Sequence, residues 1–355
     1  TGMEYEVMGE LEYYVVSEKD DLFLASDQKG YHESTPFNKG RDLRALAMKY
    51  IAETGGLIKY GHSEVGNFTK GDLMYEQNEI EFLPTKMEDA ADQLIIAKWI
   101  LRTLAYQFGV DLTFAPKITV GKAGSGLHIH TRLKKGDKNM MIENGKLTDS
   151  ALKAIAGYLD LAPSLTAFGN TNPMSYFRLV PHQEAPTNIC WGDRNRSVLV
   201  RVPLGWTSGA GDMLRDANPL EKVEDQDFSG KQTVEFRCPD GSADVYLLIA
   251  GLAVAVRHGF EMKDALQYAK ERYVDVNIFD DANKGVADRL SQLPASCYDS
   301  ALCLEKQRAD FEKYGVFAPG LIDGLVAGLK KFDDKTLRQD LGNDEAKIME
   351  LVQKY

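Results

Sequence analysis

Near its start the chain reads Glu4-Tyr5-Glu6-Val7-Met8-Gly9-Glu10-Leu11-Glu12-Tyr13-Tyr14-Val15-Val16, and two kinds of side chain alternate along it. Successive residues of a β-strand point to opposite faces. One face of this segment would carry Tyr5, Val7, Leu11, Tyr13 and Val15, and the other Glu6, Met8, Glu10, Glu12 and Tyr14. The pattern therefore predicts a strand with an apolar face toward a core and a second face that carries carboxylates.

The pair Glu10 and Glu12 has three counterparts further along the chain. Each places two ionisable residues around one apolar residue: Glu79-Ile80-Glu81, His128-Ile129-His130 and Glu235-Phe236-Arg237. A single pair of this kind is usually a solvated strand face. Four of them suggest strands that line a shared polar cavity, where cations neutralise carboxylates that would otherwise repel one another.

Length, composition and charge narrow the class of protein. The 355 residues can bury a large core, and 44% hydrophobic and 27% charged residues are ordinary for a soluble globular protein. The net charge of −11 argues against nucleic acid or an anionic membrane as the main partner. The longest apolar run, 245–256, is too short to span a bilayer. The four cysteines have no zinc-ligand spacing, which favours reduced thiols and a cytoplasmic protein.

Hydrophobic periodicity predicts strands and helices in no regular βαβ order. We expect strands at Glu4–Val16, Tyr75–Leu83, Leu112–Phe114, Leu127–Leu133, Val198–Val202 and Thr233–Arg237. We expect helices at Arg41–Glu53, from a capping box at Thr85–Glu88 to Phe108, at Thr148–Phe168 with a kink or break at Pro163, at Asp244–His258, and between Cys297 and Tyr355. This mixture indicates an α+β fold.

The acidic residues on or beside these strands suit divalent cations. The set comprises Glu10, Glu12, Glu64, Glu79, Glu235 and His128. Mg²⁺ and Mn²⁺ prefer carboxylate oxygen, and Mn²⁺ also accepts imidazole. Five carboxylates and one histidine could hold two such ions with coordination positions left for water or phosphate.

A glycine-rich run and a group of arginines are further candidates for ligand binding. The glycine-rich run Gly121–Gly126 leads into the strand of His128, so it matches neither a P-loop nor a Rossmann loop. Several arginines fall close together in this acidic chain: Arg178, Arg194, Arg196, Arg201 and Arg237. Arginine binds carboxylate and phosphate bidentately. Metal ions beside arginines describe a phosphoryl-transfer site.

An ordered series of motifs resembles the glutamine synthetase family. It consists of Gly9–Tyr13, His62–Val65, Gln77–Ile80, Thr113–Lys117, Gly124–His130, Tyr176–Leu179, Glu184–Pro186, Asn195–Ser197, Arg201–Pro203 and Val234–Ser242. The resemblance implies the fold of that family's catalytic domain, a curved, mainly antiparallel sheet with helices packed outside it. It would cover residues 1–355, with the active site in a core at 1–260 and a helical part at 261–355.

The resemblance also implies a role for each matching residue. Glu12, Glu64 and Glu79 would hold one Mg²⁺ or Mn²⁺, and Glu10, His128 and Glu235 the other. The phosphates of ATP would meet His130, Arg196 and Arg201, whereas glutamate would meet Gly124, Arg178 and Arg237. Glu184 would lie on a flap over the intermediate, so Glu184, Arg196 and Arg237 are the expected catalytic residues. Glu81 gains no role and is expected to be solvated.

The reaction implied is the ATP-dependent ligation of glutamate and ammonia through a γ-glutamyl phosphate. Family members carry a smaller N-terminal domain ahead of this point and form homo-oligomeric rings with sites between subunits. We therefore expect residues 1–355 to be part of a longer protein and to have little or no activity alone.

Departures from the family pattern leave two alternatives open. They are Ala123 in place of a common Asn, Met174-Ser175-Tyr176 before Arg178, Arg132 in place of a common Ser, and Thr233 at a position that is often basic. Of these, the altered stretch Asn172–Tyr176 and Arg132 leave room for a γ-glutamyl-amide ligase that uses an amine instead of ammonia. A non-catalytic scaffold or sensor is the second alternative, motivated by the N-terminal domain that residues 1–355 lack, although retention of all six expected metal ligands argues against it.

Overall fold

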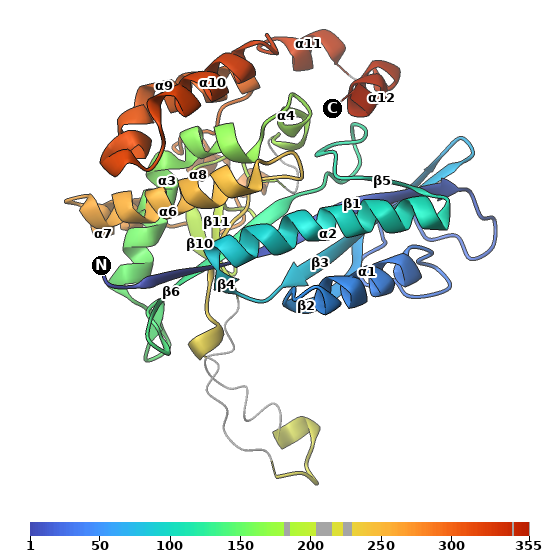
Figure 1. The fold of residues 1–355 in the computed structure, drawn as a ribbon, viewed down its shortest axis with the longest axis horizontal. Coiled ribbons are helices and arrows are strands. Elements are labelled where there is room, and N and C mark those ends of the chain that lie inside the picture. Colours follow the sequence, from blue (N-terminus) through green and yellow to red (C-terminus); the bar gives the residue numbers. More distant parts are fainter. Residues whose placement is uncertain (181–184, 204–214, 223–228, 343, 355) are drawn as a thin grey trace.

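A single mixed sheet organises the molecule (Figure 1). The structure, a computed structural model, describes residues 1–180, 185–203, 215–222, 229–342 and 344–354. Within these ranges ten strands form one open sheet whose pairings are antiparallel except for one. Helices pack against this sheet, so the predicted α+β class is confirmed.

The strand order places the chain's first strand near the middle of the sheet. The order is β10 (Trp191–Asp193), β11 (Val200–Val202), β12 (Val234–Phe236), β6 (Leu127–Lys135), β1 (Glu4–Glu18), β3 (Leu73–Phe82) and β2 (Ile58–Lys70). β4 (Thr85–Lys86) and β5 (Asp111–Thr113) also pair with β1, and β7 (Lys138–Asn139) pairs with β6. β8 (Ile142–Glu143) and β9 (Lys146–Leu147) form a separate hairpin. β1 is thus hydrogen-bonded to a neighbouring strand on each of its sides.

Some helices pack on the apolar face of the sheet, and others pack on those helices or lie further out. The helices are α1 (Arg41–Glu53), α2 (Met87–Phe108), α3 (Asp149–Gly169), α4 (Ser175–Arg178), α6 (Val245–Glu261), α7 (Ala265–Glu271), α8 (Lys284–Ala287), α9 (Cys297–Glu312), α10 (Pro319–Lys330), α11 (Leu337–Leu341) and α12 (Glu345–Lys354). Leu11 and Ile129 are fully buried in one core with Leu94 of α2 and Leu252 of α6. Figure 1 shows the red C-terminal helices α9 to α12 beyond α3 and α6. The apolar residues of the alternating strand pattern therefore form the core.

Two local predictions need correction. Thr85 and Lys86 do not form a capping box, because they pair with Val7 and Glu6 as strand β4, and α2 starts at Met87 without a side-chain cap. α3 is one helix from Asp149 to Gly169 with Pro163 inside it, so Pro163 does not break the helix.

α3 and α6 approach each other closely. Glycines lie at their contact, since a Cβ atom at Gly157 of α3 would meet the backbone of α6. α6 is apolar and largely buried in this packing. Among the described residues, no single helix is long and apolar enough to cross a membrane, and the sharply bent pair α6 and α7 meets that test by length and composition only.

Candidate active site

Strand register brings the ionisable residues into adjacent rows on one face of the sheet. Glu10 of β1 lies opposite His128 of β6 on one side and opposite Glu81 of β3 on the other. In the next row Glu12 lies opposite Glu79. Directly paired residues of an antiparallel ladder point to the same face. Residues far apart in sequence therefore meet because their strands are neighbours.

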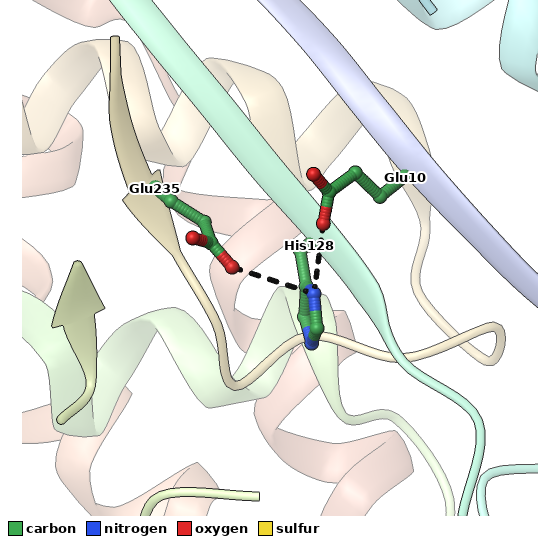
Figure 2. Close-up of side chains that lie close together, drawn as sticks. All are labelled: Glu10, His128 and Glu235. Atoms are coloured by element: carbon green, nitrogen blue, oxygen red, sulfur yellow. Dashed lines mark hydrogen bonds and ion pairs between the residues drawn. The ribbon is translucent and has the colours of Figure 1, made fainter. Parts of the chain in front are cut away.

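Glu10, His128 and Glu235 form the first compact group (Figure 2). The Nδ1 atom of His128 lies 3.1 Å from Oε2 of Glu10 and 3.4 Å from Oε1 of Glu235. Figure 2 shows the two carboxylates converging on the imidazole from strands β1 and β12. One ligand atom from each residue lies within 4.8 Å of the others. The three residues that the sequence predicted for one ion are thus brought together.

His130 lies beside this group. Its Nε2 atom is 2.8 Å from Oε1 of Glu10, and its Nδ1 atom is 3.0 Å from the hydroxyl of Thr233. Burial lowers the pKa of His130, but the charge of Glu10 and their hydrogen bond outweigh burial and raise the pKa. Burial also raises the pKa of Glu10, and His130 and His128 reverse that effect to hold it well below its usual value. Glu10 therefore stays ionised between two histidines.

Glu235 is the most enclosed carboxylate of the site. It is 0% exposed, and it forms ion pairs with Arg201 and, at 3.1 Å, with the Nε atom of Arg237. Burial raises the pKa of Glu235, but Arg201 and His130 outweigh burial and lower it. Arg237 also donates to the backbone carbonyls of Arg196 and Val198. Two guanidinium groups thus border the first group of candidate ligands.

Glu12 joins strand β1 to the glycine-rich loop. Its Oε2 atom accepts the backbone N–H of Gly126 at 2.6 Å and the side-chain amide of Gln77 at 3.1 Å. The same amide of Gln77 donates to the carbonyl of Gly124 at 2.9 Å. Glu12, Glu79 and His128 form the second compact group with ligand geometry.

Glu64 lies outside this second group. Its Oε2 atom accepts the backbone N–H of Val65, and its Oε1 atom lies 3.8 Å from Nδ1 of His62. The ladder between β2 and β3 is irregular between Ser63 and Asn67, so Glu64 lies in the stretch where the strand register shifts. Within the described part of the chain, the carboxylates of Glu12 and Glu79 are therefore grouped with His128 and not with Glu64.

Glu79 is a buried carboxylate with other negative charges around it. It is 4% exposed, and burial and then the charges of Glu10 and Glu12 raise its pKa well above the usual value. Glu64 and Glu81 add to this effect. A bound cation would relieve the repulsion, as would protonation of the carboxyl group.

The residues predicted to bind glutamate surround the glycine-rich loop. Arg178 donates to the carbonyls of Cys238 and Pro239, and its Nη2 atom lies 3.5 Å from Nε2 of His128. A Cβ atom at Gly124 would meet Pro116 and Arg178, and one at Gly126 would lie 2.9 Å from Nε2 of His128. These glycines allow the loop to approach the arginine and the imidazole closely.

Two predicted catalytic residues are less well defined by the fold. Arg196 is exposed and is connected to the site through its carbonyl, which accepts from Arg237. Glu184, expected on a flap, lies outside the described residues.

The sequence pattern missed three residues of this region. Glu81 was expected to be solvated but is 4% exposed, with its Oε2 atom 2.6 Å from Nζ of Lys59. His62 and Gln77 were noted only as parts of motifs, yet both contact candidate ligands. The alternation around Ile80 could have indicated the face that Glu81 shares with Glu79, but not its depth.

Comparison with solved structures defines the class of fold. The chain superposes on a Plasmodium falciparum glutamine synthetase with a TM-score of 0.73 at 19% identity, over 95% of this chain and 74% of that one. A structure described as apo GmaS without ligand gives a TM-score of 0.71 at 20% identity, over 95% of this chain and 70% of that one.

Comparison of sequences then gives the family. The family model for the glutamine synthetase catalytic domain matches residues 1–348. A glutamine synthetase of Thermococcus kodakarensis is 30% identical over 354 residues, which are 98% of this chain and 72% of that protein. One of Pyrococcus furiosus is 32% identical over 290 residues, or 81% of this chain and 58% of that protein. The chain belongs to the glutamine synthetase catalytic-domain family, and it spans only part of the length of these relatives.

Proposed function

We propose that this chain is the catalytic domain of a ligase that joins glutamate and ammonia at the expense of ATP. In the first step the γ-carboxylate of glutamate attacks the γ-phosphorus of ATP, so a γ-glutamyl phosphate forms and ADP leaves. In the second step ammonia attacks the γ-carbonyl carbon, the C–O bond to phosphate breaks, and the nitrogen gives up one proton, which the departing phosphate can take, so that glutamine and inorganic phosphate result. The observation that carries the proposal is the convergence of Glu10, His128 and Glu235 beside Arg201 and Arg237.

The donor atoms of the site fit hard divalent cations. Two carboxylates and one imidazole converge in the first group, and Glu79 lies among four other carboxylates whose negative charge a bound cation would offset. Glu10, His128 and Glu235 would hold one Mg²⁺ or Mn²⁺, and Glu12, Glu79 and, from the family resemblance, Glu64 the other. When bound, these ions would offset the negative charge of the ATP phosphates.

The protein's own cations would act on the two substrates. Arg201 and His130 lie on the Glu235 side of the site and would contact the transferring phosphoryl group, as would Arg196. Arg178 and Arg237 would bind the carboxylates of glutamate, and the backbone of Gly124 would approach its amino group. Glu184 would close over the γ-glutamyl phosphate and exclude water.

Phosphate release from ATP by the full-length protein tests this reaction. We expect release that requires both glutamate and ammonium in the presence of Mg²⁺ or Mn²⁺, and loss of more than about 100-fold in Glu235→Gln, which removes one ligand charge and an arginine partner. The matched control is Glu143→Gln, because Glu143 is an exposed carboxylate paired with Lys138. Absence of glutamate-dependent release by the wild-type protein would contradict the proposal and favour a scaffold or sensor.

A second candidate keeps the chemistry and replaces ammonia by an amine. It is favoured by the altered stretch before Arg178, where Asn172 accepts the backbone N–H of Met174. A panel of primary amines of increasing size separates the two. Amide formation that is faster with an alkylamine than with ammonium would select the amine ligase.

A further inference from the structure

A third group of potential ligands lies at the β2 side of the site. His62 of β2 is paired directly with Glu79 of β3, and Glu81 follows two residues later on the same face. All three side chains are buried, at 7%, 4% and 4% exposure. One ligand atom from each lies within 4.8 Å of the others. The roles proposed above use Glu79 but neither His62 nor Glu81.

Hydrogen bonding orients the imidazole of His62 toward the carboxylates. Its Nδ1 atom lies 2.9 Å from the backbone carbonyl of Ser63, which can only accept, so Nδ1 carries a hydrogen atom. The opposite atom, Nε2, lies 3.1 Å from Oε1 of Glu79 and 3.9 Å from Oε1 of Glu81. In a neutral imidazole this Nε2 atom presents a lone pair, so it and two carboxylate oxygens face one another as acceptors. A cation among them resolves that arrangement, as does a proton shared between Glu79 and Nε2.

Neighbouring side chains hold the three ligands in position. The rings of His32 and Tyr60 stack against His62, with centroids 4.5 Å and 5.4 Å away. Lys59 binds Oε2 of Glu81, and Oε1 is the oxygen on the His62 side. The Nδ1–H bond to Ser63 is the kind of outer contact that orients a metal-binding histidine.

We propose that His62, Glu79 and Glu81 bind a third divalent cation, next to the two ions of the proposed function and with Glu79 shared. One imidazole and two carboxylates suit Mn²⁺ or Zn²⁺ better than Mg²⁺. The inference concerns ion binding alone and does not depend on the proposed ligase reaction. Its competitor is an ion-free arrangement in which a proton, carried by the imidazole or by the carboxyl group of Glu79, joins the two side chains.

The number of Mn²⁺ ions bound per chain tests the third site. The wild-type chain and two variants are freed of metal with EDTA and dialysed against Mn²⁺, and the bound metal is counted. Glu81→Gln removes one proposed ligand and keeps the side-chain shape. Glu6→Gln is the control, because Glu6 is a similarly enclosed carboxylate of the same sheet that pairs with Arg132 at 2.6 Å and Lys134 at 3.5 Å.

We expect Glu81→Gln to bind one ion fewer than the wild type, or to hold that ion 10- to 100-fold more weakly, roughly the range for lost metal contacts. Glu6→Gln should bind as many ions as the wild type. An unchanged count and affinity in Glu81→Gln would overturn the proposal. Because the readout is binding, it is independent of whether the protein releases phosphate from ATP.

A measurement on the wild-type chain covers the case in which Glu81→Gln does not fold. Imidazole ¹H–¹⁵N NMR observes the six histidines, and His62→Gln identifies the signals of His62. On addition of Zn²⁺ we expect Nε2 of His62 to lack a bound hydrogen and to shift, while Nδ1 keeps its hydrogen. If both nitrogens stay protonated at saturating Zn²⁺, or if the Nε2 signal of His62 does not shift, the site binds no ion and the proposal is overturned.

Discussion

Gly157 of α3 faces Gly259 of α6 so closely that a Cβ atom at Gly157 would lie 2.8 Å from the backbone nitrogen of Gly259. The reverse contact, from a Cβ atom at Gly259 to the nitrogen of Gly157, would measure 2.9 Å. Gly157→Ala or Gly259→Ala must therefore push two buried helices apart. We expect each to lower the free energy of unfolding by about 1–3 kcal/mol, as overpacking does, measured by urea denaturation.

The control for these variants is Gly324→Ala in α10. An added Cβ atom at Gly324 would meet nothing within 4 Å. Because alanine is the better helix former, this change should raise stability by up to about 1 kcal/mol. Destabilisation of similar size at all three glycines would show that the contact between α3 and α6 is not what restricts Gly157 and Gly259.

Divalent ions should stabilise the folded chain. Glu79 is buried beside four carboxylates, and a bound cation relieves their repulsion only in the folded state. At Mn²⁺ concentrations about 100-fold above the dissociation constant, one site adds about 2.7 kcal/mol to the free energy of unfolding. Thermal unfolding with and without EDTA measures the effect. His128→Gln should reduce the gain and Glu143→Gln should leave it intact; equal gains in both would contradict the ligand role of His128.

Gln77 should matter for both stability and ion binding. Its amide nitrogen donates to Glu12 and to the carbonyl of Gly124, and its amide oxygen accepts the backbone N–H of Gly66 at 3.0 Å. Gln77→Ala removes these three hydrogen bonds from buried groups, and we expect a loss of about 2–3 kcal/mol together with weaker Mn²⁺ binding. Urea denaturation and a Mn²⁺ titration measure the two effects. The exposed Gln267→Ala should change stability by less than about 0.5 kcal/mol, and an equally small change at Gln77 would refute its bridging role.

The ion pairs of His258, outside the active site, should make the stability of the fold depend on pH. His258 joins three helices, since its Nε2 atom is 2.8 Å from Asp160 of α3 and its Nδ1 atom is 3.2 Å from Asp310 of α9. The hydrogen bond with Asp160 raises the pKa of His258 above its unfolded value, against the smaller lowering effect of burial. The protonated form thus stabilises the fold fully below the unfolded pKa of about 6.5, and the stabilisation is lost as the pH rises through the folded pKa.

The variant His258→Gln tests whether this stabilisation is larger at low pH than at high pH. We expect it to lower the free energy of unfolding by about 1 kcal/mol at pH 5.5 and by less at pH 9, where the wild-type imidazole is neutral as well. Urea denaturation of both proteins at the two pH values gives the difference. A deficit that is equal at both values, or larger at pH 9, would contradict the assignment.

Much of the sheet could be predicted from alternation alone, whereas the group of Glu10, His128 and Glu235 was implied by the family resemblance. The period of two assigns Leu11 and Ile129 to the core and Glu10 and His128 to the opposite face, and the structure agrees. The helix Arg41–Glu53 was also predicted with its observed bounds. Strand order was not predicted, because it depends on contacts between segments that no local pattern records.

The failures have local physical causes. The irregular ladder between Ser63 and Asn67 leaves Glu64 outside the group with Glu12 and Glu79 that the family resemblance implied. Pairing of Thr85 with Val7 in the sheet replaced the local hydrogen bonds of a capping box. Glu81 was misjudged because periodicity gives the face of a side chain but not the depth to which neighbouring strands bury it.

The rows of paired strands also have a consequence for how the sheet assembles. If β1 were to slip by one residue against β3 and β6, Glu10 and Glu12 would enter the apolar core and Leu11 would face the polar site. Burying two unpaired carboxylates is far less favourable than burying leucine. The same charges that serve the site therefore discriminate against misregistered pairing, so a variant that replaces them with apolar residues should lose fidelity of strand alignment as well as ion binding.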